Sequence, residues 1–125
     1  MKDIMKFGLF YQIQVPKPWS ADSEAKRIWE ALDQIAYAEE MGYDSVWFSE
    51  HHFRPEWSHN SAPDLTLAAV SQRTSRIRLG VGVVLAPIHH PLHTAVRMAT
   101  LDILSKGRVD VGIGRTGYPY QLTPY

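Results

Sequence analysis

Two short segments of the sequence concentrate side chains that can transfer protons or bind charged groups. Residues 49–54 read Ser-Glu-His-His-Phe-Arg, and residues 86–91 read Ala-Pro-Ile-His-His-Pro. A histidine can give or take a proton near neutral pH, and an adjacent carboxylate such as Glu50 can orient it. These segments therefore predict acid–base chemistry, with His51 and His52 as the central candidates, although residue types alone name no reaction.

A third segment, residues 112–117, reads Gly-Ile-Gly-Arg-Thr-Gly and fits the dinucleotide-binding fingerprint letter for letter. That fingerprint should open a helix whose amino end holds a pyrophosphate. Here it is followed by Tyr118-Pro119-Tyr120, with no helical pattern and no acidic residue further on. We therefore interpret it as a strand that runs into a glycine-rich loop, in which Arg115 is either a phosphate contact or a solvated charge.

His89 and His93 are four residues apart, a spacing that can place two metal ligands on one helix face. However, Pro91 begins the helix between them, and the sequence marks no third ligand. We expect no metal site here, and we interpret the cluster as a polar loop.

These chemical segments alternate with predicted strands and helices. Apolar runs predict strands at residues 6–10, 45–48, 78–85 and 108–114. Helical patterns cover residues 23–41, residues 61–74 and the segment from Pro91 to just before Gly107, whereas residues 115–125 have no helical pattern. Asp22 or Ser23 can cap the first helix by accepting a backbone N–H bond, and Gly42 can end it in a left-handed turn.

The order strand-helix-strand predicts right-handed crossovers and a parallel sheet with its helices on one side. Two α/β completions are open: a doubly wound sheet, or a (β/α)8 barrel of which this chain would form the first four units. In either fold the carboxyl ends of the strands meet, so the chemical segments share one rim. A half-barrel would also leave an uncovered inner face, which we expect to drive self-association or to need the missing half.

Composition excludes several other classes of protein. The chain has 125 residues, enough for one domain over residues 1–125, and is 45% hydrophobic. Its formal net charge is zero, whereas a nucleic-acid-binding protein normally carries a basic excess. It has no long apolar run for a membrane span, and residues 1–6 lack the apolar core of a signal peptide. It has no cysteine, so we expect a cytoplasmic protein without disulfides or thiolate metal sites.

Four motifs resemble the luciferase-like flavin-dependent monooxygenase family, and the resemblance runs over the whole chain. They lie at residues 7–10, 42–53, 90–91 and 101–108, where the last reads Leu-Asp-Ile-Leu-Ser-Lys-Gly-Arg. The resemblance implies the N-terminal half of a (β/α)8 barrel, usually a homodimer. It also implies a monooxygenase that uses O2 and reduced FMN, or a reduced deazaflavin in a sister branch, to oxygenate a small organic substrate. A separate flavin reductase would supply the reduced FMN.

The resemblance also assigns roles to single residues. His51 matches the catalytic histidine at the flavin, with Glu50 as its supporter, and Arg115 matches a contact to the flavin phosphate, where a planar guanidinium can bind two oxygens. Gly82 and Val83 match a pair joined by a non-proline cis peptide behind the flavin ring.

Gly114 belongs to the same cofactor-binding set. It stands where bacterial luciferase has a reactive cysteine, so we do not expect light emission. The resemblance further implies that loops of the other half largely determine the substrate.

Two other functions remain open from the residues. The chain could be a non-catalytic half-barrel that dimerises or binds a ligand, which a folded dimer without flavin affinity would favour. It could also be a metal-dependent barrel hydrolase that uses Glu50 and the histidine cluster, which elemental analysis would test.

Overall fold

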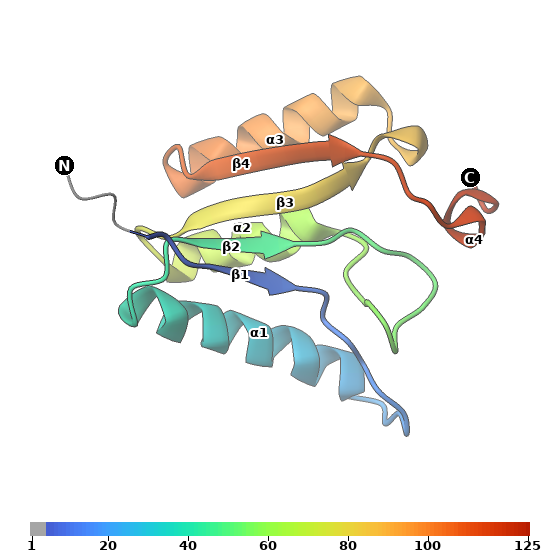
Figure 1. Ribbon diagram of the computed structural model, residues 1–125, viewed down its shortest axis with the longest axis horizontal. Coiled ribbons are helices and arrows are strands. Elements are labelled where there is room, and N and C mark those ends of the chain that lie inside the picture. Colours follow the sequence, from blue (N-terminus) through green and yellow to red (C-terminus); the bar gives the residue numbers. More distant parts are fainter. Residues whose placement is uncertain (1–4) are drawn as a thin grey trace.

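The computed structural model describes residues 5–125, and its centre is a parallel sheet (Figure 1). The strands are β1 (Gly8–Tyr11), β2 (Ser45–Phe48), β3 (Arg78–Leu85) and β4 (Val109–Gly114). They pair in the order β1-β2-β3-β4, and every pair is parallel. The parallel α/β sheet expected from the sequence is therefore confirmed, although β1 begins two residues later than predicted. Most of the N-terminal segment inspected for a signal peptide lies outside the described residues.

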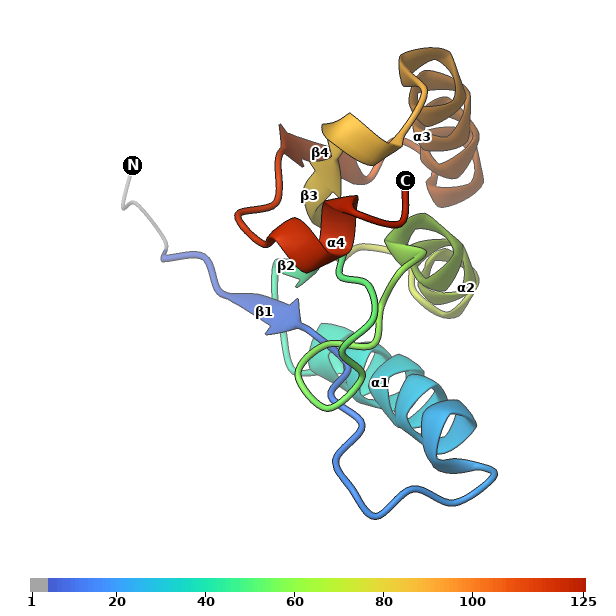
Figure 2. The same cartoon turned by 90° about the vertical axis from the view of Figure 1, so that its right-hand side faces the viewer.

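Three long helices connect the strands and cover one face of the sheet (Figure 2). They are α1 (Ser23–Glu40), α2 (Pro63–Arg73) and α3 (Pro91–Ser105). Each joins two neighbouring parallel strands, as repeated β/α units require. Among residues 5–125, none of the helices combines the length and the apolar character that a membrane crossing needs.

Local sequence explains where the helices begin and end. Pro63 and Pro91 are the first residues of α2 and α3, where a missing N–H breaks no helical bond. Gly42 follows α1 with a φ of 92°, the left-handed conformation that glycine tolerates. Asp22 stands at the N-cap of α1, but the prediction that Asp22 or Ser23 caps the helix with its side chain is wrong. The Asp22 carboxylate accepts a hydrogen bond from the Ser20 hydroxyl at 2.8 Å instead.

The chain after β4 also differs from prediction. Residues 119–122 form a short helix, α4 (Pro119–Leu122), in the tail expected to be free of helix. Pro119 occupies its first turn, where its fixed φ suits a helix. One turn is too short to show a periodic apolar pattern, so no pattern in the sequence indicates this helix. A 3-10 turn, η1 (Ala86–Ile88), similarly links β3 to α3.

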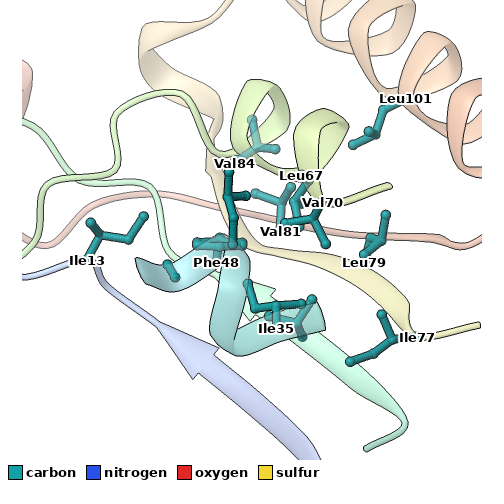
Figure 3. Packing of buried hydrophobic residues seen from close by; sticks show 13 residues of the cluster. Ile13, Ile35, Phe48, Leu67, Val70, Ile77, Leu79, Val81, Val84 and Leu101 are labelled. Carbon is teal, nitrogen blue, oxygen red and sulfur yellow. The ribbon is translucent and has the colours of Figure 1, made fainter. Parts of the chain in front are cut away.

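The hydrophobic core lies between the sheet and the three long helices (Figure 3). Alternation along the strands directs every second side chain into it. Its members from the strands are Val46, Phe48, Leu79, Val81 and Val84, and its larger members from the helices are Leu32, Ile35, Leu67, Val70 and Leu101. Removal of this apolar surface from water is the main stabilising contribution to the fold.

The opposite face of the sheet has no covering layer within residues 5–125, and it carries aromatic side chains beside the ion pair of Arg78 and Asp110. Phe10 and Trp47 lie there, and the side chain of Phe10 is 60% exposed. A Cβ at Gly80 would collide with the Trp47 indole, so only glycine lets this ring lie flat against β3. The uncovered inner face expected of a half-barrel is therefore present.

Two charged side chains close the amino end of the sheet. The carboxylate of Glu39 accepts backbone N–H bonds from residues 75, 76 and 77, just before β3. The guanidinium of Arg108 donates to backbone carbonyls of residues 71, 74, 77 and 105. Together they fix the turns that lead into β3 and β4.

Candidate functional site

The predicted chemical segments meet at the carboxyl ends of the strands. Residues 49–54 follow β2, η1 follows β3, and Arg115 follows β4. The short helix α4 lies in front of the strand ends when the sheet is viewed along its strands (Figure 2). The structure therefore forms the shared rim that the strand order predicts.

Glu50 is the centre of a buried hydrogen-bonded cluster and is only 3% exposed. Its Oε1 lies 2.9 Å from Nε2 of His52 and 2.6 Å from Nε2 of His89. Its Oε2 accepts the backbone N–H of Leu85 at 2.9 Å. A carboxylate can only accept, so both imidazoles carry hydrogen on Nε2. Glu50 thus joins the ends of β2 and β3 to the loop before α3.

A cavity of about 460 Å³ lies beside this cluster, between the first turns of α2 and α3. Its charged pair is Arg97 and Asp64, 2.5 Å apart, and the hydrogen bond that Arg97 donates to the Asp64 carboxylate raises the pKa of Arg97. The neighbouring His90 caps α3, because its Nδ1 accepts the backbone N–H of Leu92. Across residues 5–125, no three His, Cys, Asp or Glu side chains are arranged as metal ligands.

His51 has a different environment from that of His52. Its Nδ1 lies 3.1 Å from the side-chain amide of Gln121, and its ring packs on Trp57 with the centroids 4.8 Å apart. Burial is the largest influence on the pKa of His51, and it lowers that pKa. The neutral ring is therefore favoured at neutral pH.

Adjacent side chains point to opposite surroundings, as expected for His51 and His52. His52 faces Glu50, and its Nδ1 lies 3.3 Å from the Tyr125 hydroxyl. The expectation that Glu50 orients His51 needs correction, because the carboxylate is used by His52, His89 and the backbone of Leu85. Glu50 acts on His51 only through its charge, which raises the pKa of the ring.

The three small residues of the predicted cofactor set lie close together on the uncovered face. The Gly82–Val83 peptide bond is cis, as the resemblance implied. A Cβ at Gly114 would lie 2.8 Å from Cγ2 of Val83, so glycine makes room for that side chain. A Cβ at Gly82 would lie 3.3 Å from the Trp47 ring. Contact of these residues with a cofactor stays a prediction.

Arg115 is exposed in the connection between β4 and α4. It lines a wide hollow of about 490 Å³ together with Thr116, Tyr118 and Leu122. Within residues 5–125 its guanidinium forms no ion pair, so its charge is available to an anion. Its role as a phosphate contact stays a prediction.

Sequence reasoning missed two partners of the site. Gln121 lies in a segment without periodicity, and no motif marks it as a neighbour of His51. His89 was interpreted as part of a polar loop, whereas it donates to a buried carboxylate. The available signal was Glu50 itself, because a carboxylate that follows a buried strand directly needs partners if it is buried too.

Comparison with known proteins places this geometry in context. Residues 5–125 match the luciferase-like monooxygenase family. The chain is 40% identical over 95 residues to 4-hydroxyprotoasukamycin monooxygenase from Streptomyces nodosus subsp. asukaensis, covering 76% of this chain and 25% of that protein. It is 31% identical over 117 residues to the oxygenase component of the flavin-dependent trigonelline monooxygenase from Acinetobacter baylyi, covering 94% and 32%. The chain thus spans between a quarter and a third of the length of these relatives.

Solved structures share the fold. The oxygenating constituent of 3,6-diketocamphane monooxygenase from Pseudomonas putida, in complex with FMN, matches with a TM-score of 0.86 and 27% identity, covering 96% of this chain and 32% of that one. The coenzyme F420-dependent tetrahydromethanopterin reductase from Methanopyrus kandleri matches with a TM-score of 0.67 and 28% identity, covering 95% and 29%. The four strands of this chain therefore correspond to part of a larger enzyme fold in each case.

Proposed function

The chain belongs to the luciferase-like monooxygenase family, and we propose that it is the N-terminal part of a flavin-dependent monooxygenase built on a (β/α)8 barrel. The enzyme uses reduced FMN and O2 to oxygenate a small organic substrate, and a separate reductase supplies the reduced FMN. The relative from Acinetobacter supports this division, since it is named as an oxygenase component. The FMN complex of the Pseudomonas structure supports the choice of cofactor.

The observation that carries the proposal is the state of His51 at the carboxyl rim of the sheet. Burial lowers its pKa, so the neutral form of the ring is favoured at pH near 7. It is held by Gln121 and Trp57 rather than by an ion pair. A neutral, oriented imidazole can hold or move a proton at its free nitrogen, whereas His52 is committed to Glu50.

The residues present fit a flavin. A flavin has a flat, largely apolar ring, and the uncovered face offers Val83 beside two positions without a Cβ, Gly82 and Gly114. It also has a phosphate, and the Arg115 guanidinium at the rim is not committed to a carboxylate within residues 5–125. Gly82, Val83 and Gly114 would lie against the ring, Arg115 would bind the phosphate, and His51 would handle a proton. FMN, when bound, supplies the redox chemistry with O2.

A reduced deazaflavin is the second candidate cofactor, and the structural match to an F420-dependent reductase favours it. The same residues would receive its ring. Parallel titrations with the two reduced cofactors decide between them, because the tighter ligand identifies the branch of the family.

The first test is an anaerobic titration of the 125-residue chain with reduced FMN, run beside a sizing column. We expect micromolar binding that Arg115→Gln weakens by at least about tenfold, since a charge-assisted hydrogen bond contributes about 1.5–3 kcal/mol. Reduced riboflavin, which has no phosphate, should bind the wild type and the variant equally. Arg27→Gln, on the exposed side of α1, is the matched control and should change neither affinity. Equal FMN affinity for Arg115→Gln and wild type contradicts the phosphate contact.

The exposed apolar surface supports a homodimer. Val96 and Ile103 on α3 are 63% and 78% exposed, and Ile113 on β4 is 68% exposed. Apolar area of this kind favours association with a second copy or with the rest of a barrel. The sizing column tests this directly. A dimer that binds neither cofactor would instead favour the non-catalytic half-barrel.

A further inference from the structure

Gln121 is a fully buried polar side chain that reaches His51 from the far end of the chain. It lies on α4 and is 0% exposed. Its Nε2 lies 3.1 Å from Nδ1 of His51. We propose that Gln121 is the positioning residue of His51, and that it holds the ring in the tautomer with hydrogen on Nε2. This inference rests on the proposed function only for the chemical role of the hydrogen on Nε2 of His51.

With the amide oriented as in this structure, the hydrogen bond selects one of the two neutral tautomers of His51. An amide NH2 group can only donate, so Nδ1 of His51 must accept and the ring hydrogen must reside on Nε2. Within residues 5–125, Nε2 of His51 has no hydrogen-bond partner of its own. The neutral ring therefore presents an N–H donor to whatever occupies the rim.

A second observation concerns the other atom of the same amide. Oε1 of Gln121 is buried and has no hydrogen-bond partner among the described residues. Unpaired buried carbonyls are uncommon, because burial removes the water that would otherwise bind them. A half-turn of the amide would bring this oxygen to Nδ1, where it could accept the second hydrogen of an imidazolium ring. Gln121 can thus pair with His51 in both of its protonation states.

The other groups around His51 cannot take over this role. Trp57 packs on the ring face and leaves both nitrogens free. Glu50 and His52 act on the ring through their charges, in opposite directions, and they hydrogen bond to each other. The proton position of His51 therefore depends on Gln121, not on the adjacent carboxylate that the sequence suggests.

The test is a ¹⁵N NMR titration of the histidine side chains in the 125-residue chain. Long-range ¹H–¹⁵N spectra distinguish the two neutral tautomers, and His51→Gln assigns the signals. We expect wild-type His51 to show the Nε2–H tautomer above its pKa. Gln121→Met should produce a mixture of tautomers, because methionine fills the space without a strong donor.

Gln121→Glu should raise the pKa of His51 by at least about one unit, since a carboxylate at this place favours the charged ring. Gln34→Glu, an exposed position on α1 that contacts Tyr11 and not His51, adds the same charge and should leave the His51 signals unchanged. Amide spectra of each variant verify that it is folded.

The inference is overturned if both Gln121 variants fold and His51 keeps the wild-type tautomer and pKa. Neither readout needs a cofactor, so failure of this inference is separable from failure of the proposed function. If the chain shows the expected NMR result but binds no reduced flavin, the positioning role of Gln121 is supported and the proposed monooxygenase function is contradicted.

Discussion

The two ends of the sheet use their charged groups in different ways. At the amino end, Arg108 and Glu39 bond mainly to backbone carbonyls and N–H groups of the turns that they fix, and Arg78 and Asp110 form an exposed pair beside them. At the carboxyl end, side chains bond mainly to other side chains: Glu50 to two histidines, and His51 to Gln121. The carboxyl end also holds the unpartnered Oε1 of Gln121, whereas the groups at the amino end are fully used.

This difference separates stability from chemistry within one small fold. A charge bonded to backbone stabilises the shape of the chain whatever the neighbouring side chains are. At Glu39, burial raises the pKa, but the N–H bonds to residues 75–77 and the charge of Arg108 outweigh it, and the net pKa is lowered. Side chains bonded to each other can change partner or protonation state. The same division holds in (β/α)8 enzymes, whose active sites lie at the carboxyl face and whose amino face serves stability.

The largest expected effect is therefore at the amino end. Arg108→Ala removes the guanidinium that four carbonyl oxygens share, and it should lower the free energy of unfolding by about 3 kcal/mol. Urea denaturation followed by tryptophan fluorescence measures the change. Under conditions in which Arg108→Ala is still folded, its affinity for reduced FMN should equal that of the wild type.

Arg27→Ala provides the control for this prediction. Arg27 forms an exposed pair with Glu30 at 3.0 Å, so its loss should change the free energy of unfolding by less than about 0.5 kcal/mol. If Arg108→Ala is no more destabilising than Arg27→Ala, the amino end does not have the stabilising role assigned to it.

The second prediction concerns Glu50, which lies at the carboxyl end but, like Glu39, also accepts a backbone N–H. Glu50→Gln keeps the shape but places an NH2 group where His52, His89 or Leu85 donates, so one buried donor loses its acceptor. We expect a loss of about 2 kcal/mol in the free energy of unfolding. Thermal and urea unfolding measure it, with Glu56→Gln at the exposed pair with Lys17 as control. A change no larger than in that control would show that the cluster contributes little to stability.

Sequence patterns predicted the sheet more fully than the site. Strand periodicity and the glycine and proline signals placed β2 and β3 at their observed bounds and α3 within a residue or two. These features depend on near neighbours in the chain, which the sequence displays directly. The short helix α4 escaped prediction because one turn has no period.

The partners in the site depend on contacts between distant residues. His51 and Gln121 are 70 residues apart, and Glu50 and His89 are 39 apart. The strand order placed the segments at one rim but could not determine which side chain each histidine meets. Adjacency along the chain suggested Glu50 for His51, yet the alternation of neighbouring side chains gives Glu50 to His52 instead.

The smallest expected effect tests the protonation of His51 through stability. Burial lowers its pKa in the folded chain below the ordinary value of 6.5, so the unfolded chain binds more protons as the pH falls. The contribution of the neutral ring is complete above about pH 6.5 and is lost as the pH drops toward the folded pKa. The wild type should therefore lose more stability than His51→Gln between pH 7.5 and pH 5.5. Urea unfolding of both chains at the two pH values gives this difference. The contributions of the other histidines are the same in both chains and therefore cancel.

At pH 7.5 the substitution His51→Gln should lower the free energy of unfolding by less than about 1 kcal/mol. An equal loss in both chains would mean that His51 titrates as a solvated histidine, and the carboxyl end would then lack its neutral, oriented ring.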